Sequence, residues 1–188
     1  MIKNNTLIIN INNDNYNKII KKTRRYIKLC DKKNLKFKYE TDLNNEELKD
    51  IEEAINLKDK KEWIEFIYDK ICLDLDKKIN TNYCEFENDI CIKYRYKNSN
   101  HKNGCCECKG RGKCKYLIGS TCTMKTCMAC KLFTCKTLRK KGIKHNINDY
   151  IIGKYFFTRK QKDLLRYSFW TPKEIVIDRL LKNEYVKP

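Results

Sequence analysis

The sequence predicts a mainly α protein with small β elements (α+β), in which a loop-rich, cysteine-containing metal-binding knot packs among helices. Several long stretches repeat apolar residues at helical spacing, whereas only short stretches alternate apolar and charged residues as strands do. In addition, eight of the twelve cysteines lie between Cys105 and Cys135, where aliphatic residues are few. We expect this segment to depend on metal for its stability.

The first 40 residues alternate between strand and helix patterns. Residues 6–11, TLIINI, predict a short strand. From about residue 15 to 30, apolar residues recur mostly at helical spacing, which predicts one amphipathic helix with Cys30 as a small buried side chain. Residues 35–40, LKFKYE, alternate apolar and charged side chains and predict a short, half-buried strand.

Two helices are predicted between residues 44 and 79. Asn44 followed by Glu47 has the spacing of a capping box, which predicts a helix from there to Leu57. A second helix is predicted over about 59–79, with Cys72 as another buried thiol. The apolar side chains that we expect it to turn toward the core are Trp63, Ile64, Phe66, Ile67, Ile71, Leu73 and Leu75.

A change of pattern divides the chain near residue 97. Residues 82–96 lose the helical spacing, and CIKYRY within them predicts a strand. The stretch NSNHKNG, at 98–104, is rich in turn-forming residues and predicts a linker. We therefore expect an α+β N-terminal region over 1–97 and a basic cysteine-cluster region with C-terminal helices over 98–188.

Capping signals mark the helices of the last third of the chain. Gly142 is expected to end a short helix. Thr158 with Gln161 has capping-box spacing and predicts a helix that runs to about Tyr167.

A last helix is predicted from the sequence TPKE. Thr171 is expected to cap it, with Pro172 at its first position. The helix should run to about Asn183. Its inward side chains are expected to be Ile175, Val176, Leu180 and Leu181.

The basic residues are concentrated in the second half of the chain. The net charge is +18; residues 1–96 contain 20 Lys and Arg against 18 Asp and Glu, whereas residues 97–188 contain 22 against 6. This distribution predicts contact with nucleic acid, DNA or RNA, without dependence on base sequence. The alternative is a solvated basic surface that reflects a composition rich in Lys, Asn and Ile. The expected contacts are Lys109, Arg111, Lys113, Lys115, Arg139, Lys140, Lys141 and Lys144.

The cysteine cluster has the spacing of a metal site. A gap of two residues occurs at Cys105/Cys108 and again at Cys127/Cys130, and it lets two thiolates of one turn reach the same ion. Zinc is the first expectation, and an iron–sulfur cluster is the alternative that the sequence leaves open. The predicted ligands are Cys105, Cys106, Cys108, Cys114, Cys122, Cys127, Cys130 and Cys135.

The stretch CKYLIGSTCTMKTCMACKLFTC resembles the YkgJ-like cysteine-cluster proteins, a zinc- or iron-chelating family. Cys105 and Cys106 match the early cluster of that family. Its later positions are matched by Cys114, Cys122 and Cys130. The chain departs from the pattern at Thr126-Cys127, where an Arg-Pro pair is often found. The resemblance implies a metal-chelating module and no particular reaction.

These observations favour a binding protein over an enzyme. We expect a metal-stabilised binding module whose basic half contacts nucleic acid. The alternatives are an iron–sulfur protein with a redox, sensing or maturation role, and a metal-dependent enzyme. No apolar run reaches the roughly 20 residues of a membrane helix, and the first residues lack a secretory apolar region. We therefore expect a cytoplasmic protein without a membrane partner.

Overall fold

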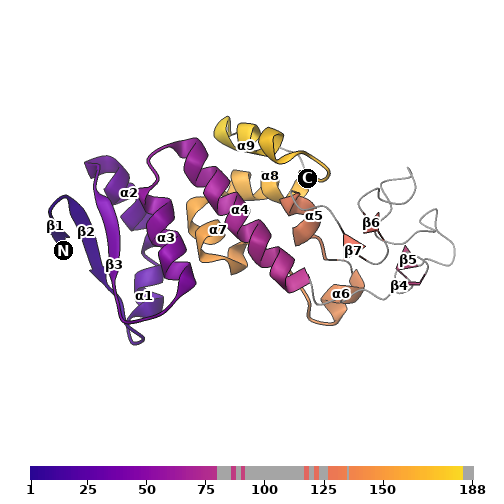
Figure 1. The fold of residues 1–188 in the computed structure, drawn as a ribbon, viewed down its shortest axis with the longest axis horizontal. Coiled ribbons are helices and arrows are strands. Elements are labelled where there is room, and N and C mark those ends of the chain that lie inside the picture. Colours follow the sequence, from indigo (N-terminus) through magenta and orange to yellow (C-terminus); the bar gives the residue numbers. More distant parts are fainter. Residues whose placement is uncertain are drawn as a thin grey trace.

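The computed structural model is mainly helical with a small three-stranded sheet, which confirms the predicted fold class. The sheet lies at one end of the molecule, and the long helix α4 (Lys60–Ile79) crosses the middle of the molecule (Figure 1). The structure describes residues 1–79, 86–87, 90–91, 117–118, 121–122, 127–134 and 136–183.

The sheet has the strand order β1 (Ile2–Lys3), β2 (Thr6–Asn10), β3 (Lys36–Glu40). Strand β2 is antiparallel to β1 and parallel to β3, with Leu7 opposite Phe37. In β3 the side chains of Phe37 and Tyr39 are buried while the three charged residues are exposed. The half-buried strand predicted from the alternating pattern is therefore confirmed.

The connection from β2 to β3 contains two helices where one was predicted. These are α1 (Tyr16–Ile20) and α2 (Thr23–Lys33). The break has a local cause, because the buried hydroxyl of Thr23 donates to the carbonyl oxygen of Ile20 at 2.7 Å. A side chain that binds a carbonyl in this way competes with the helical backbone for it.

Helix α3 (Glu46–Asn56) begins one residue later than predicted. Its cap is Asn45 and not Asn44, since Asn45 Oδ1 accepts the N–H of Glu47 at 2.8 Å. At the other end of α3, Asn56 hydrogen-bonds to both backbone groups of Phe37. The helix is thereby tied to strand β3.

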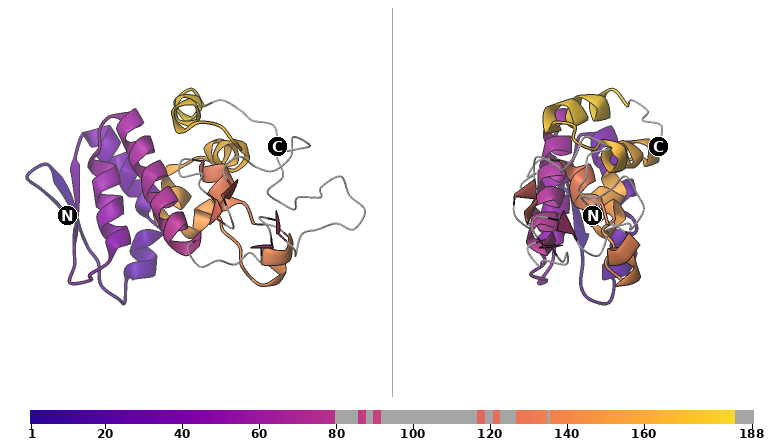
Figure 2. Two further views of the ribbon diagram at one scale, coloured as in Figure 1. Left: turned by 45° about the vertical axis from the view of Figure 1, so that its right-hand side comes forward. Right: turned by 90° about the vertical axis from the view of Figure 1, so that its right-hand side faces the viewer.

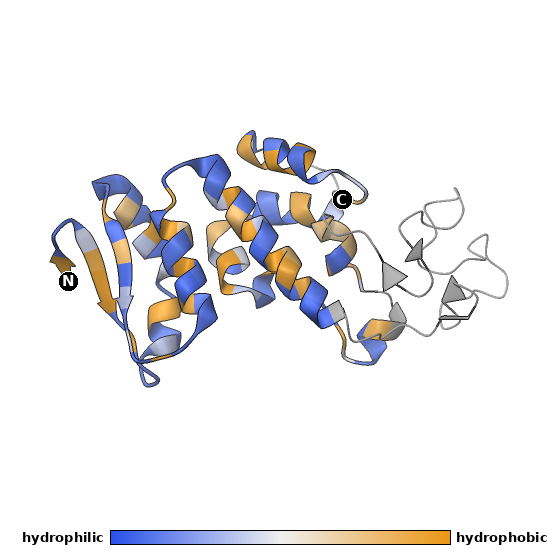
Figure 3. Cartoon of the chain, viewed as in Figure 1, coloured by the Kyte–Doolittle hydropathy of each residue, from blue (hydrophilic) through white to orange (hydrophobic). Residues whose placement is uncertain are grey.

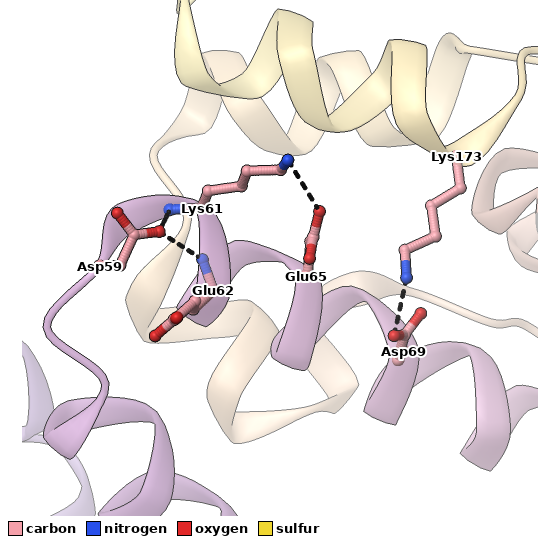
Figure 4. A network of polar contacts seen from close by, with 6 residues as sticks. All are labelled: Asp59, Lys61, Glu62, Glu65, Asp69 and Lys173. Atoms are coloured by element: carbon pink, nitrogen blue, oxygen red, sulfur yellow. Dashed lines mark hydrogen bonds and ion pairs between the residues drawn. The ribbon is translucent and has the colours of Figure 1, made fainter.

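Helix α4 forms over the predicted residues and is capped by Asp59. The carboxylate of Asp59 accepts the backbone N–H groups of Lys61 and Glu62 at 2.8 and 2.9 Å (Figure 4). The core side of α4 includes the predicted Ile64, Ile67, Ile71 and Leu75 together with Tyr68 and Cys72. The prediction for Leu73 is wrong, because 57% of its surface is exposed.

The predicted capping box at Thr158 is confirmed and opens α8 (Arg159–Tyr167). Gln161 donates its backbone N–H to Thr158 Oγ1 at 3.3 Å, and Gln161 Oε1 accepts the backbone N–H of Thr158 at 2.9 Å. Both partners come from the same turn, which explains why the sequence alone was sufficient.

Helix α9 (Lys173–Leu181) differs from its prediction at the cap and in the residues facing inward. The hydroxyl of Thr171 donates to the carbonyl of Phe169 and does not cap the helix. Val176 and Leu180 are buried as predicted, but Ile177 is buried in place of Ile175. The ammonium group of Lys173 lies 2.8 Å from the carboxylate of Asp69 and ties α9 to α4 (Figure 4).

A contiguous apolar core runs from Leu7 in the sheet to Leu180 in the last helix. Figure 3 shows apolar residues alternating with polar ones along α4 and along the helices around it. The predicted linker at 98–104 lies outside the described residues. Further described elements are β4 (Phe86–Glu87), β5 (Ile90–Cys91), β6 (Leu117–Ile118), β7 (Thr121–Cys122), α5 (Met128–Leu132), α6 (Lys136–Lys140), the 3-10 helix η3 (Ile147–Asp149) and α7 (Ile151–Phe156).

Candidate metal centre

Helix α5 fixes the second predicted C-x-x-C pair against the core. It packs on α4 and α8 (Figure 2). Met128 is buried, and its backbone N–H donates to the hydroxyl of Tyr68 at 3.0 Å. Cys127 immediately precedes α5 and Cys130 lies within its first turn. The two-residue gap therefore brings both thiols to the same end of the helix.

The Cys127 sulfur is buried between backbone N–H groups and the carbonyl oxygen of Ser168. Only 1% of the residue is exposed. A hydrogen bond with the Cys130 side chain lowers the thiol pKa of Cys127 to about 6, and backbone donors of Cys130, Trp170 and Thr171 contribute, although burial opposes them. These donors favour the thiolate at Cys127, the form that binds metal, whereas the Ser168 carbonyl oxygen, 3.6 Å from the sulfur, accepts a hydrogen bond from the thiol form.

The loop between α8 and α9 supplies two of these donors. Trp170 has φ of 55°, a left-handed conformation that bulky residues seldom adopt. Holding a residue there costs about 1–3 kcal/mol and persists only where the surroundings impose it. Trp170 and Thr171 were not predicted as site residues. They act through backbone N–H groups, which every residue type except proline has, so the sequence carried no signal for them.

Cys30 and Cys72 are buried, as predicted, and differ from Cys127 in their ionisation. Burial raises the pKa of the Cys30 thiol, and it raises that of Cys72 to about 12, although Lys131 acts in the opposite direction. Both groups are neutral thiols at physiological pH. They pack as small hydrophobic side chains.

Lys131 is buried on α5 and forms an ion pair with Asp76 of α4. The pair links the helix that carries the C-x-x-C motif to the centre of the molecule. Removal of Asp76 would leave the ammonium group buried without its partner, which is strongly unfavourable. Lys131 therefore has a structural role beside the two cysteines.

The other six predicted ligands are not described at the level of side chains. Cys122 lies in β7, which pairs with β6 through Leu117. Among the described residues, no group of three or more His, Cys, Asp and Glu side chains forms a metal site. Cys127 and Cys130 would thus need further ligands. The predicted ligands that lie outside the described residues are Cys105, Cys106, Cys108, Cys114 and Cys135.

The described part of the predicted nucleic-acid contact lies in α6 and the turn after it. Gly142 has φ of 79° and follows the last residues of α6, as predicted for a helix end. The predicted contact residues that lie here are exposed: Arg139, Lys140, Lys141 and Lys144. The remaining predicted contacts lie outside the described residues: Lys109, Arg111, Lys113 and Lys115.

Comparison of the chain with protein-family models, curated proteins and solved structures found no match. The resemblance to the YkgJ-like proteins therefore stays a prediction. Among the described helices, none is both long enough and apolar enough to cross a membrane.

Proposed function

We propose that this protein binds a metal through a thiolate site to which Cys127 and Cys130 contribute two ligands. The observation that carries the proposal is the surroundings of the Cys127 sulfur. It lies beside the Cys130 thiol and receives backbone hydrogen bonds from Cys130, Trp170 and Thr171. These donors stabilise the negative charge of a thiolate before any metal arrives.

The two sulfurs fit zinc. Structural zinc is held tetrahedrally by Cys and His ligands, and pairs separated by two residues are typical of such sites. The remaining ligands would come from the other six predicted cysteines. Bound zinc would cross-link them to the end of α5 and contribute to the folding free energy of the cysteine-rich segment.

An iron–sulfur cluster is the second candidate, and the backbone donors around Cys127 favour it. Hydrogen bonds to cysteine sulfur are one of the means by which proteins set the reduction potential of such clusters. The burial of Cys127 also keeps solvent from this sulfur. This form of the protein would have a redox, sensing or maturation role.

Elemental analysis and native mass spectrometry test the metal proposal on the full chain purified without oxygen. We expect a stoichiometric metal, with zinc giving a colourless protein and an iron–sulfur cluster a brown one. The double variant Cys127→Ser/Cys130→Ser should lose metal. The matched control is Cys30→Ser/Cys72→Ser, which removes two buried thiols and should retain it.

Two results would contradict the metal proposal. One is a wild-type protein that contains no metal and whose cysteines all react freely with a thiol reagent in the native state. The other is equal metal loss from the two double variants, which would show that the site is not built on the C-x-x-C pair.

We further propose that the basic half of the chain contacts nucleic acid through phosphate groups. The exposure of Arg139, Lys140, Lys141 and Lys144 supports this proposal. Each phosphate contact contributes about 0.7–0.9 to the slope of log K against log salt. Replacing Arg139, Lys140 and Lys141 by Ala should therefore flatten the slope by roughly 2–3.

The control for this measurement is the removal of three exposed N-terminal cations, Lys21, Lys22 and Arg25, which should change the slope much less. An absence of binding to single- and double-stranded nucleic acid at low salt would exclude the contact. The basic half would then reflect composition alone.

A further inference from the structure

Three aromatic side chains lie together beside the cysteine pair and form what we call the aromatic surface: Phe133, Phe169 and Trp170. The ring centroids of Phe133 and Phe169 are 6.1 Å apart, and those of Phe169 and Trp170 are 5.5 Å apart. Phe133 is 47% exposed and Trp170 is 40% exposed. Large aromatic side chains that are exposed and contiguous mark interaction sites more often than isolated ones do.

The aromatic surface is held in place by the structure behind it. Phe169 packs against the buried Cys127 and Ala129. Trp170 adopts a left-handed backbone conformation while its N–H is directed to the Cys127 sulfur. A preorganised ring loses little conformational entropy when a partner binds. The rings are thus positioned before any partner arrives.

The net charge of the segment that contains the aromatic surface favours a polyanionic partner. Residues 127–183 contain 14 Lys and Arg against 4 Asp and Glu. Exposed aromatic rings within a basic region are the features that single-stranded nucleic acid requires, because phosphates are attracted by the cations and bases stack on the rings. Paired bases within a duplex are not accessible for such stacking.

The geometry points to the aromatic surface as a platform on which unpaired nucleic-acid bases stack. This inference rests on the proposed nucleic-acid contact and specifies that the nucleic acid is single-stranded. The planes of Phe133 and Phe169 are inclined by 79°, and those of Phe169 and Trp170 by 44°. Rings at such angles present separate faces. Bases would therefore stack one at a time, without selection of sequence.

The test compares a fluorescently labelled oligothymidylate with the same strand in a duplex, using the full chain. Wild-type protein should bind the single strand more tightly. Trp170→Gly should weaken that binding by about 5- to 100-fold. Glycine adopts the left-handed conformation readily, so this variant removes the ring while keeping the backbone donors to Cys127. Its metal content should equal that of the wild type.

A second variant and a spectroscopic signal support the same test. Phe133→Ala removes an exposed ring from the end of α5, outside the loop that carries Trp170, and should weaken single-strand binding in the same direction. In a Trp63→Phe background, oligothymidylate should quench the fluorescence of Trp170. The matched control is Ile2→Ala, which removes a side chain that is 50% exposed on β1, at the far end of the molecule (Figure 1).

Three outcomes would overturn the inference. The first is equal binding of single strand and duplex by the wild type. The second is unchanged single-strand affinity in both Trp170→Gly and Phe133→Ala. If replacing Arg139, Lys140 and Lys141 by Ala still flattens the slope of log K against log salt, the proposed phosphate contact stands without the stacking platform. The third is a change of oligomeric state in Trp170→Gly with unchanged affinity, which would identify a contact between copies of the chain.

Discussion

At the scale of residues, Cys127 and Cys72 show how position changes the chemistry of the same side chain. Cys72 lies within α4, where burial raises the thiol pKa to about 12. Cys127 is equally buried, yet the Cys130 side chain and the backbone donors lower its pKa to about 6. Hydrogen bonds to the charged form of Cys127 thus outweigh its desolvation.

This difference predicts how stability depends on pH in the metal-free, reduced protein. Folding lowers the pKa of the Cys127 thiol from 9.0 to about 6. The resulting stabilisation is fully present above the unfolded value and is lost as the pH falls through the folded value. The free energy of unfolding should therefore rise by about 2 kcal/mol between those two pH values, allowing for solvent screening.

Urea denaturation in the presence of chelator and reductant measures this rise. In Cys127→Ser the free energy of unfolding should rise less with pH, whereas in Cys30→Ala it should rise as in the wild type. In the Cys30 thiol, burial raises the pKa, so its ionisation affects stability only at higher pH. The same pH dependence in Cys127→Ser and wild type would show that another group is responsible.

At the scale of elements, helix α3 closes the open edge of strand β3. Asn56 accepts the N–H of Phe37 at 2.8 Å and donates to its carbonyl at 2.9 Å. Glu52 accepts the N–H of Tyr39 at 3.0 Å. These side chains take the place of a further strand. An edge covered in this way is protected from pairing with another chain.

Substitution of Asn56 tests the importance of this edge. Asn56→Ala would leave both backbone groups of Phe37 without their partner. We expect the free energy of unfolding to fall by about 1–3 kcal/mol in urea denaturation. The slope of this free energy against urea concentration should stay unchanged. Asn44→Ala, at an exposed position before the same helix, should change the free energy of unfolding by less than about 0.5 kcal/mol. Equal effects of the two substitutions would argue against a role for the edge contact.

At the scale of the whole molecule, the two predicted regions share buried side chains. Trp63 of α4 lies 6.0 Å from the ring of Phe156 and 5.9 Å from that of Phe157, between ring centroids. The guanidinium group of Arg24 donates to the backbone carbonyls at the end of α7, among them that of Tyr155 at 3.2 Å. The predicted boundary near residue 97 stays a prediction, but the core does not stop there.

Cooperativity between the regions can be tested with Phe157, which is fully buried. Phe157→Ala should lower the free energy of unfolding by about 3–5 kcal/mol. If the core unfolds as one unit, hydrogen exchange should accelerate in the amides of β2 and β3 as well as in α8. Phe133→Ala removes an exposed ring and should leave exchange in the sheet unchanged. Acceleration confined to the C-terminal helices would show that residues 1–97 unfold independently.

The sequence by itself determined the features that depend on near neighbours. The alternation in LKFKYE predicted the buried face of β3, and Thr158 with Gln161 predicted the start of α8. The two-residue spacing of Cys127 and Cys130 predicted that they form a pair. Each of these signals involves residues within one turn or one strand, where chain geometry limits the arrangements that can form.

Only the tertiary structure decided which side chains are buried and what surrounds the cysteine pair. Leu73 follows the apolar pattern of α4, yet it is exposed because no described element covers it, whereas Tyr68 is buried against α5. Two of the backbone donors at the Cys127 sulfur, Trp170 and Thr171, come from a loop about 40 residues further along the chain. Such contacts depend on how helices pack, and local sequence patterns do not specify that packing.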